Sequence, residues 1–175
     1  MQHLIEKAKT IRLLILDVDG TLTSGVIYYG NQGAELKGFH IHDGMGIKLL
    51  QKAGIKIAVI TAKKSEAVAK RMSDLNIEHV YFGQEEKLAA YENLKQTLQL
   101  SDNEIAYMGD DLPDLPLLRR VNLAITVPNA PLIIKQHADL ITKKKPGKGA
   151  VREVCEFILE AQNHYQSVLQ SYLTK

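Results

Sequence analysis

The stretch "LLILDVDGTLTSG" (residues 13–25) passes from uninterrupted apolar residues into two aspartates, a glycine and two threonines. A continuous apolar run, here residues 11–16, is typical of a strand that is covered on both faces. Asp17 and Asp19 follow where this run ends. We therefore expect a buried strand that carries negative charge at its carboxyl end.

Beyond this stretch, short apolar runs alternate with segments of helical spacing. Further strands are predicted at residues 55–60, 78–82, 105–108, 123–127 and 138–142. Helices are predicted at residues 43–52 with Asp43 as the N-cap, at 65–75, at 85–98, near 115, after Pro131, and at 151–172. Residues 26–29 and 34–39 flank "GNQG", which suits a hairpin turn.

This alternation predicts an α/β fold: a Rossmann-like, doubly wound and mainly parallel sheet. The 175 residues fit a single domain, 1–175, with a β-hairpin insertion at about 24–40 and a C-terminal helix at about 150–172. The gaps from Asp17 to Thr61 and from Thr61 to Lys87 are too short for a separate cap domain.

The composition excludes several classes of protein. A formal net charge of +2 indicates neither a nucleic-acid partner nor an anionic membrane surface. The single cysteine, Cys155, excludes an internal disulfide framework and fits a reducing compartment. The opening "MQHLIEKAKTIR" lacks the apolar core of a signal peptide, and no run approaches the length of a membrane span. We expect a soluble cytoplasmic protein.

Polar residues cluster at the predicted carboxyl ends of four strands, where ligands bind in open α/β sheets. Taken singly, such residues are usually helix caps or turn formers, but their repetition at four strand ends favours a site. Asp17, Asp19 and Asp110 offer hard oxygen ligands, and no histidine or cysteine lies nearby in the motifs, which favours Mg²⁺ over zinc. The cluster comprises Asp17, Asp19, Thr61, Lys87, Asp110, Asp111 and Asp114.

In their order, "DVDGT", "VIT", Lys87 and "GDDLPD" resemble the signature of the haloacid dehalogenase superfamily of phosphotransferases. The resemblance implies that Asp17 attacks phosphorus to form an aspartyl phosphate, while Asp19 protonates the leaving oxygen and then activates water. It also implies that Mg²⁺ is bound by Asp17, by Asp110 and by the backbone carbonyl of Asp19. Thr61 and Lys87 are then expected to bind the phosphoryl oxygens. Asp111 and Asp114 are expected to support the metal site. With an ordinary pKa near 4, Asp17 is expected to be ionised at neutral pH without a base.

Longer segments, among them "FHIHDGMGIKLL" and "GKGAVREVCEFIL", are similar to the cap-less 3-deoxy-D-manno-octulosonate 8-phosphate phosphatase family. This resemblance implies Mg²⁺-dependent hydrolysis of that sugar-acid phosphate in lipopolysaccharide precursor synthesis. It also implies a homotetramer whose hairpins associate and whose active sites lie between subunits. Lys63 and Arg71, on the helix expected after Thr61, are the nearest cations for the substrate carboxylate. Ala62, Lys63 and Pro146 depart from the family pattern, and lysine lacks the bidentate fork of arginine.

Alternatives of other classes stay open at this stage. A phosphatase for a nine-carbon ulosonate 9-phosphate would need the same phosphate site and a similar carboxylate clamp. A non-catalytic assembly module could share the fold, although the four motifs are retained. A phospho-acceptor receiver domain also clusters aspartates and a lysine, but its acceptor would lie on a central strand rather than in a "DxDGT" on the first.

Overall fold

The fold is built on a six-stranded sheet in which all neighbouring strands are parallel, in the order β5-β4-β1-β6-β7-β8. The computed structural model describes residues 2–31 and 34–174. The strands of this sheet are β1 (Leu13–Leu16), β4 (Lys56–Ile60), β5 (His79–Tyr81), β6 (Ile105–Met108), β7 (Leu123–Thr126) and β8 (Leu140–Ile141). This order confirms the predicted doubly wound sheet, and no separate cap domain occurs within the described residues.

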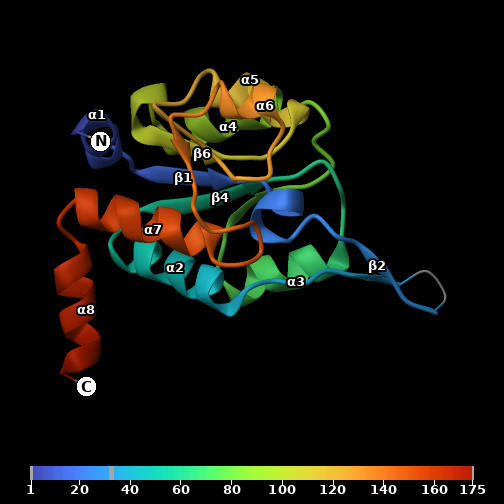
Figure 1. Cartoon of the computed structure of the whole chain (residues 1–175), viewed down its shortest axis with the longest axis horizontal. Helices are drawn as coiled ribbons and strands as arrows, with labels where there is room; N and C mark the ends of the chain where they lie inside the picture. The colour runs from blue at the N-terminus through green and yellow to red at the C-terminus, as the bar shows by residue number, and fades with distance from the viewer. Residues whose placement is uncertain (1, 32–33, 175) are drawn as a thin grey trace.

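Helices cover both faces of the sheet. In Figure 1, α2, α3 and α7 lie below the sheet, and α4, α5 and α6 lie above it. The helices are α1 (Gln2–Lys9), α2 (Ile41–Lys52), α3 (Glu66–Asp74), α4 (Lys87–Leu98), α5 (Leu115–Leu118), α6 (Leu132–Lys135), α7 (Ala150–Ala161) and α8 (Tyr165–Leu173). Shorter helical turns span Val18–Leu22, Asp102–Glu104 and Leu112–Asp114. None of the helices described is both long and apolar enough to span a membrane.

The core explains why these strands form. Every residue of β1, β6 and β7 is buried, as expected for strands packed between two helical layers. Each fully buried leucine or isoleucine side chain contributes about 1.5–3 kcal/mol relative to an exposed one. Because β1 pairs with β4 on one side and β6 on the other, its carboxyl end lies at the point where the chain changes winding direction. Ligands bind at this position in folds of this kind.

The hairpin is present but shorter than predicted. Strands β2 (Tyr28–Tyr29) and β3 (Glu35–Leu36) pair in antiparallel fashion and form a separate two-stranded sheet. Gln32 and Gly33 of the predicted turn lie outside the described residues. Figure 1 shows β2 extending away from the main body of the molecule.

Two predictions about helices were wrong. The single helix predicted over 151–172 is in fact α7 and α8, separated at Asn163, whose backbone is left-handed at φ 59°. Helix α2 begins before Asp43, so Asp43 is not its N-cap. The Asp43 carboxylate instead accepts hydrogen bonds from the backbone amides of Gly149 (3.3 Å) and Arg152 (2.8 Å), at the start of α7.

Candidate active site

The turn after β1 is built around Gly20. Its φ of 86° is a left-handed conformation that glycine adopts without steric cost. A Cβ atom at this position would lie 2.0 Å from Oδ2 of Asp110, so a larger residue would force the Asp110 side chain to shift. The amide of Asp17 donates to the carbonyl of Met108 at 2.9 Å, which ties the end of β1 to the end of β6. The sequence "DVDGT" therefore places Asp17 beside the loop that carries Asp110.

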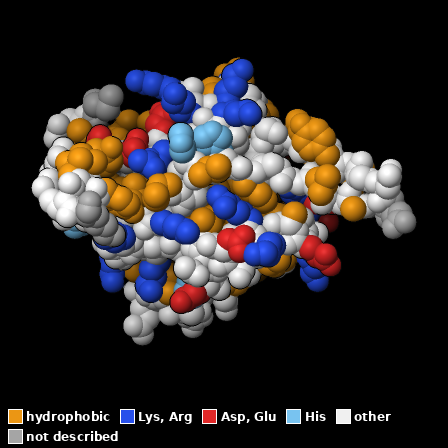
Figure 2. Space-filling model, turned by 90° about the horizontal axis from the view of Figure 1, so that it is seen from below, with side chains coloured by type: hydrophobic (Ala, Val, Ile, Leu, Met, Phe, Trp, Pro, Cys, Tyr) orange, Lys and Arg blue, Asp and Glu red, His pale blue; other side chains and the backbone are white. Residues whose placement is uncertain are grey.

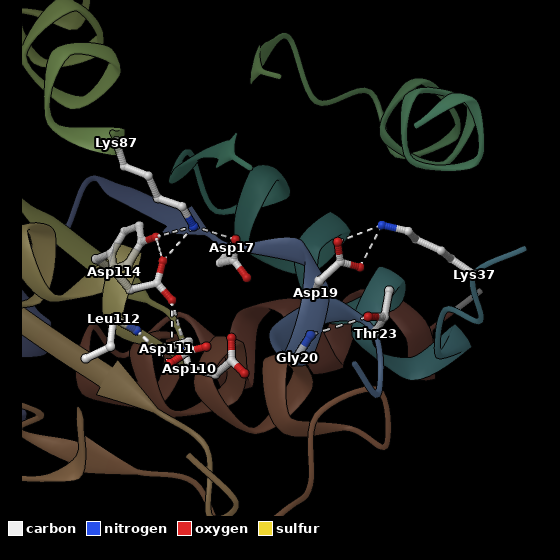
Figure 3. A network of polar contacts seen from close by, with 11 residues as sticks. Asp17, Asp19, Gly20, Thr23, Lys37, Lys87, Asp110, Asp111, Leu112 and Asp114 are labelled. Atoms are coloured by element: carbon white, nitrogen blue, oxygen red, sulfur yellow. Dashed lines mark hydrogen bonds and ion pairs between the residues drawn. The ribbon is translucent and has the colours of Figure 1, made fainter. Parts of the chain in front are cut away.

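Lys87, at the first residue of α4, lies at the centre of the site (Figure 3). Its Nζ atom is 2.5 Å from Oδ1 of Asp17 and 2.6 Å from Oδ1 of Asp114, and all three residues are buried. Burial opposes the charged ammonium, but the carboxylates of Asp17 and Asp114 outweigh it and raise the pKa of Lys87. The lysine is therefore a buried cation between two carboxylates.

Asp114 organises the loop after β6. Its Oδ1 accepts from the hydroxyl of Tyr107 at 2.5 Å as well as from Lys87, and its Oδ2 accepts from the amides of Asp110 (2.8 Å) and Asp111 (3.1 Å). Asp111 in turn accepts from the amide of Leu112 at 2.8 Å. Since both oxygens of Asp114 already accept hydrogen bonds, this residue supports the site and leaves Asp110 to face Asp17.

The carboxylates of Asp17, Asp110 and Asp114 each place one oxygen within 4.8 Å of the others. Burial, followed by the charge of Asp114, raises the pKa of Asp17 to about 7, although Lys87 acts in the opposite direction. Burial and the charge of Asp17 likewise raise the pKa of Asp110 to about 7. The expectation that Asp17 has an ordinary pKa was therefore wrong for the chain without a cation, because crowded, buried carboxylates resist ionisation.

This donor set fits a magnesium ion. All the clustered groups are carboxylates, the hard oxygen ligands that Mg²⁺ prefers. Burial and the charges of neighbouring carboxylates raise the pKa values of Asp17 and Asp110, and Lys87 does not offset both effects. A divalent cation at this position would relieve that repulsion.

Asp19 lies apart from this cluster. Figure 3 shows its carboxylate directed toward Lys37 rather than toward Lys87. Both oxygens of Asp19 accept from Nζ of Lys37, at 2.7 and 2.6 Å. Sequence reasoning missed Lys37, because one lysine in a hairpin strand carries no signal that separates it from a solvated side chain.

The remaining predicted residues have different surroundings. Thr61 is buried directly after β4, the strand next to β1, and its amide donates to the carbonyl of Tyr81 at 3.0 Å. Lys63 precedes α3 and lies in a loop, so its predicted place on a helix was wrong. Arg71 is on α3 and packs beneath the start of α2: its Nη2 lies 3.5 Å from the carbonyl of His40, and its guanidinium carbon lies 5.9 Å from the centre of the Phe39 ring. The structure thus joins Asp17, Lys87, Asp110 and Asp114, but not Arg71, in one cluster.

Comparison with known proteins places these residues in a family. A model of haloacid dehalogenase-like hydrolases matches residues 77–154. The chain is 46% identical over 159 residues to 3-deoxy-D-manno-octulosonate 8-phosphate phosphatase of Yersinia pestis, with 91% of this chain and 85% of that protein covered. The identity to the phosphatase of the same name from Escherichia coli K12 is also 46%, over 158 residues, with 90% and 84% covered. The chain belongs to the 3-deoxy-D-manno-octulosonate 8-phosphate phosphatase family.

Several solved structures have the same fold as this chain along nearly its whole length. The phosphatase of Moraxella catarrhalis, solved in complex with a magnesium ion, a phosphate ion and a KDO molecule, superimposes with a TM-score of 0.96 at 42% identity, covering 98% of this chain and 99% of that chain. The cobalt-bound phosphatase of Haemophilus influenzae superimposes with a TM-score of 0.91 at 36% identity, covering 95% and 99%. A hydrolase of the haloacid dehalogenase superfamily from Legionella pneumophila gives 0.96 at 50% identity, covering 100% and 96%.

Proposed function

We propose that this chain hydrolyses 3-deoxy-D-manno-octulosonate 8-phosphate to the free sugar acid and phosphate. The observation that carries the proposal is the buried Asp17, held by Lys87 at the switch point of a sheet that matches phosphatases of that name along most of its length. In this reaction Asp17 attacks phosphorus and forms an aspartyl phosphate, as the bond from phosphorus to the sugar oxygen breaks. Asp19 gives its proton to the departing oxygen, and later takes a proton from the water that cleaves the aspartyl phosphate.

The remaining site residues follow from their positions. Lys87, a buried ammonium beside Asp17, would bind a phosphoryl oxygen, and Thr61 at the end of the adjacent strand would bind another. Asp17, the backbone carbonyl of Asp19 and Asp110 would hold Mg²⁺, with Asp111 and Asp114 fixing their loop. When bound, Mg²⁺ supplies the positive charge that lets an anionic phosphate approach these carboxylates. Lys63 and Arg71 remain our candidates for the substrate carboxylate.

We also propose a homotetramer with active sites between subunits, located in the cytoplasm. Figure 2 shows hydrophobic side chains gathered on the projecting hairpin, and Tyr29 is 73% exposed there. Val26, Tyr28 and Leu36 are exposed on the same hairpin. An exposed apolar group of this kind is typical of an association surface. Light scattering after gel filtration tests the number of subunits, and a monomeric mass would refute this part of the proposal.

The activity is tested by phosphate release from the eight-carbon 8-phosphate and from a nine-carbon ulosonate 9-phosphate, each with Mg²⁺ and with chelator. We expect Mg²⁺-dependent turnover of the eight-carbon acid, and a loss on the order of a thousand-fold or more in Asp17→Asn. Asp74→Asn, at an exposed ion pair with Lys70 on α3, is the matched control. Turnover of the nine-carbon acid alone would change the substrate, and release from neither would favour the assembly module.

A further inference from the structure

Lys37 has a buried side chain although it belongs to a hairpin that is largely exposed. Its side chain is 1% exposed, although its neighbour Leu36 is 59% exposed. Its Nζ atom contacts both oxygens of Asp19, at 2.7 and 2.6 Å, and lies 3.3 Å from Oε1 of Glu35. Burying an ammonium costs free energy unless carboxylates compensate it, so these contacts account for where the lysine lies.

The arrangement orients Asp19 from outside its own loop. Both oxygens of Asp19 accept from one ammonium, so rotation of the carboxylate would break at least one contact. Figure 3 shows that the lysine approaches Asp19 from the side opposite Asp17. Asp19 is therefore held by a residue that lies 18 positions later in the chain, outside the helical turn Val18–Leu22 that contains Asp19.

We propose that Lys37 is a positioning residue for Asp19, setting the orientation from which Asp19 transfers protons. This inference rests on the proposed function. In the first step the proton of Asp19 passes to the sugar oxygen as the phosphorus–oxygen bond breaks; in the second, a proton of water passes to Asp19 as water bonds to phosphorus and the bond to Asp17 breaks. While Asp19 is ionised, Lys37 donates to both of its oxygens. While Asp19 carries the proton, Lys37 donates to the other oxygen, and it keeps its own protons in both steps. It touches no reacting atom in this scheme.

The test is a double-mutant cycle on phosphate release in Mg²⁺. Lys37→Met, which keeps the length and apolar stem of the side chain, should lower kcat by about 10- to 100-fold, which is less than the roughly 100- to 10,000-fold contribution of a general acid–base group because Asp19 itself remains. Lys37→Arg should restore most of the loss, because a guanidinium also binds both oxygens of a carboxylate. In an Asp19→Asn background, Lys37→Met should cause less than about a twofold further loss, because residues that act through one another are not additive. Lys70→Met, which removes an exposed lysine paired with Asp74, is the matched control and should leave kcat unchanged.

Three results would overturn the proposal. An equal loss in both backgrounds would mean that Lys37 acts independently of Asp19. A rise in KM without a change in kcat would make Lys37 a substrate contact. If Lys37→Arg does not restore kcat, and both Lys37→Met and Lys37→Arg lower the melting temperature, then Lys37 only stabilises the hairpin.

A separate arm distinguishes failure of this inference from failure of the proposed function. If wild-type chain hydrolyses p-nitrophenyl phosphate but not the sugar-acid phosphate, the substrate assignment fails, and the cycle is run on the aryl ester, whose aspartyl phosphate still needs Asp19 for hydrolysis. If the effects of Lys37→Met and Asp19→Asn on this hydrolysis are not additive, the result supports the role of Lys37. If the two effects are additive, the result refutes it. Absence of turnover of any phosphomonoester by the wild-type chain would refute both proposals.

Discussion

Magnesium binding to this chain should release protons near neutral pH. The two carboxylates proposed as ligands, Asp17 and Asp110, each have a pKa raised to about 7 by burial and neighbouring charge. A metal ion binds the ionised forms, so it competes with the protons on these groups. The test therefore compares the affinity for Mg²⁺ at about pH 6 with the affinity at about pH 8.

The magnitude follows from the two pKa values. If both groups titrate near 7, both are ionised in roughly 1% of molecules at pH 6 and in roughly 80% at pH 8. The apparent affinity for Mg²⁺ should then rise by about 100-fold over this range, which is about 2.7 kcal/mol of binding free energy. At pH 7 each group is about half protonated, so binding should release roughly one proton per ion.

Isothermal titration calorimetry measures both quantities. Titrations at pH 6, 7 and 8, each in two buffers of different ionisation enthalpy, give the dissociation constant and the number of protons released. Asp74→Asn, remote from the proposed ligands on α3, should behave as wild type. Equal affinity at pH 6 and pH 8, or a binding enthalpy independent of buffer, would refute the claim that protonated carboxylates compete with the ion.

The same pKa shifts set the pH dependence of stability. Because the folded pKa values of Asp17 and Asp110 lie above those of the unfolded chain, near 4, the folded state binds more protons between about pH 4 and pH 7. The free energy of unfolding without metal should therefore fall as pH rises through this window. Urea denaturation in chelator tests this sign, and saturating Mg²⁺ at pH 8 should restore the lost stability.

Three substitutions test the structure elsewhere. Asp43→Ala removes the carboxylate that accepts from the first amides of α7, and urea denaturation should show a loss of about 1–2 kcal/mol with kcat retained; unchanged stability would contradict this capping role. Tyr107→Phe removes the buried hydroxyl that donates to Asp114, and should lower the free energy of unfolding by about 1.5–3 kcal/mol in the same assay; a loss below about 0.5 kcal/mol would contradict it. Gly20→Ala places a Cβ against Asp110 in a left-handed backbone, so calorimetry should show at least about a tenfold weaker affinity for Mg²⁺, and wild-type affinity would show that Asp110 moves aside freely.

The sequence predicted the sheet because its signals are local. Apolar runs without alternation identified β1, β4, β6 and β7, and each is buried almost throughout. The aspartates of the site were also predictable, since parallel strands end at the same edge of a sheet and bring their following loops together. The grouping of Asp17, Asp110 and Asp114 with Lys87 follows from the fold and from four short motifs.

The features that sequence reasoning got wrong depend on tertiary contacts. Apolar residues recur every three or four positions on both sides of Asn163, so their periodicity gives no sign of the break between α7 and α8. At that break the side chain of Gln162 donates to the carbonyls of Ala8 (3.0 Å) and Ile11 (2.7 Å), far away in the sequence. Asp43 had the form of an N-cap, but its carboxylate caps another helix. The raised pKa of Asp17 likewise depends on burial and on Asp114, which a motif does not measure.

The unpredicted Lys37 separates two parts of the proposed reaction. The groups proposed to face phosphorus are Asp17, directly after β1, and Lys87, at the start of α4, and short motifs specify both. The orientation of Asp19 depends instead on the hairpin, through a lysine that only the folded chain brings within 2.6 Å. The hairpin also carries the exposed Tyr29 of the proposed subunit interface. Proton transfer and association would therefore depend on one insertion, so a substitution that displaces the hairpin should impair Asp19 while leaving attack by Asp17 possible.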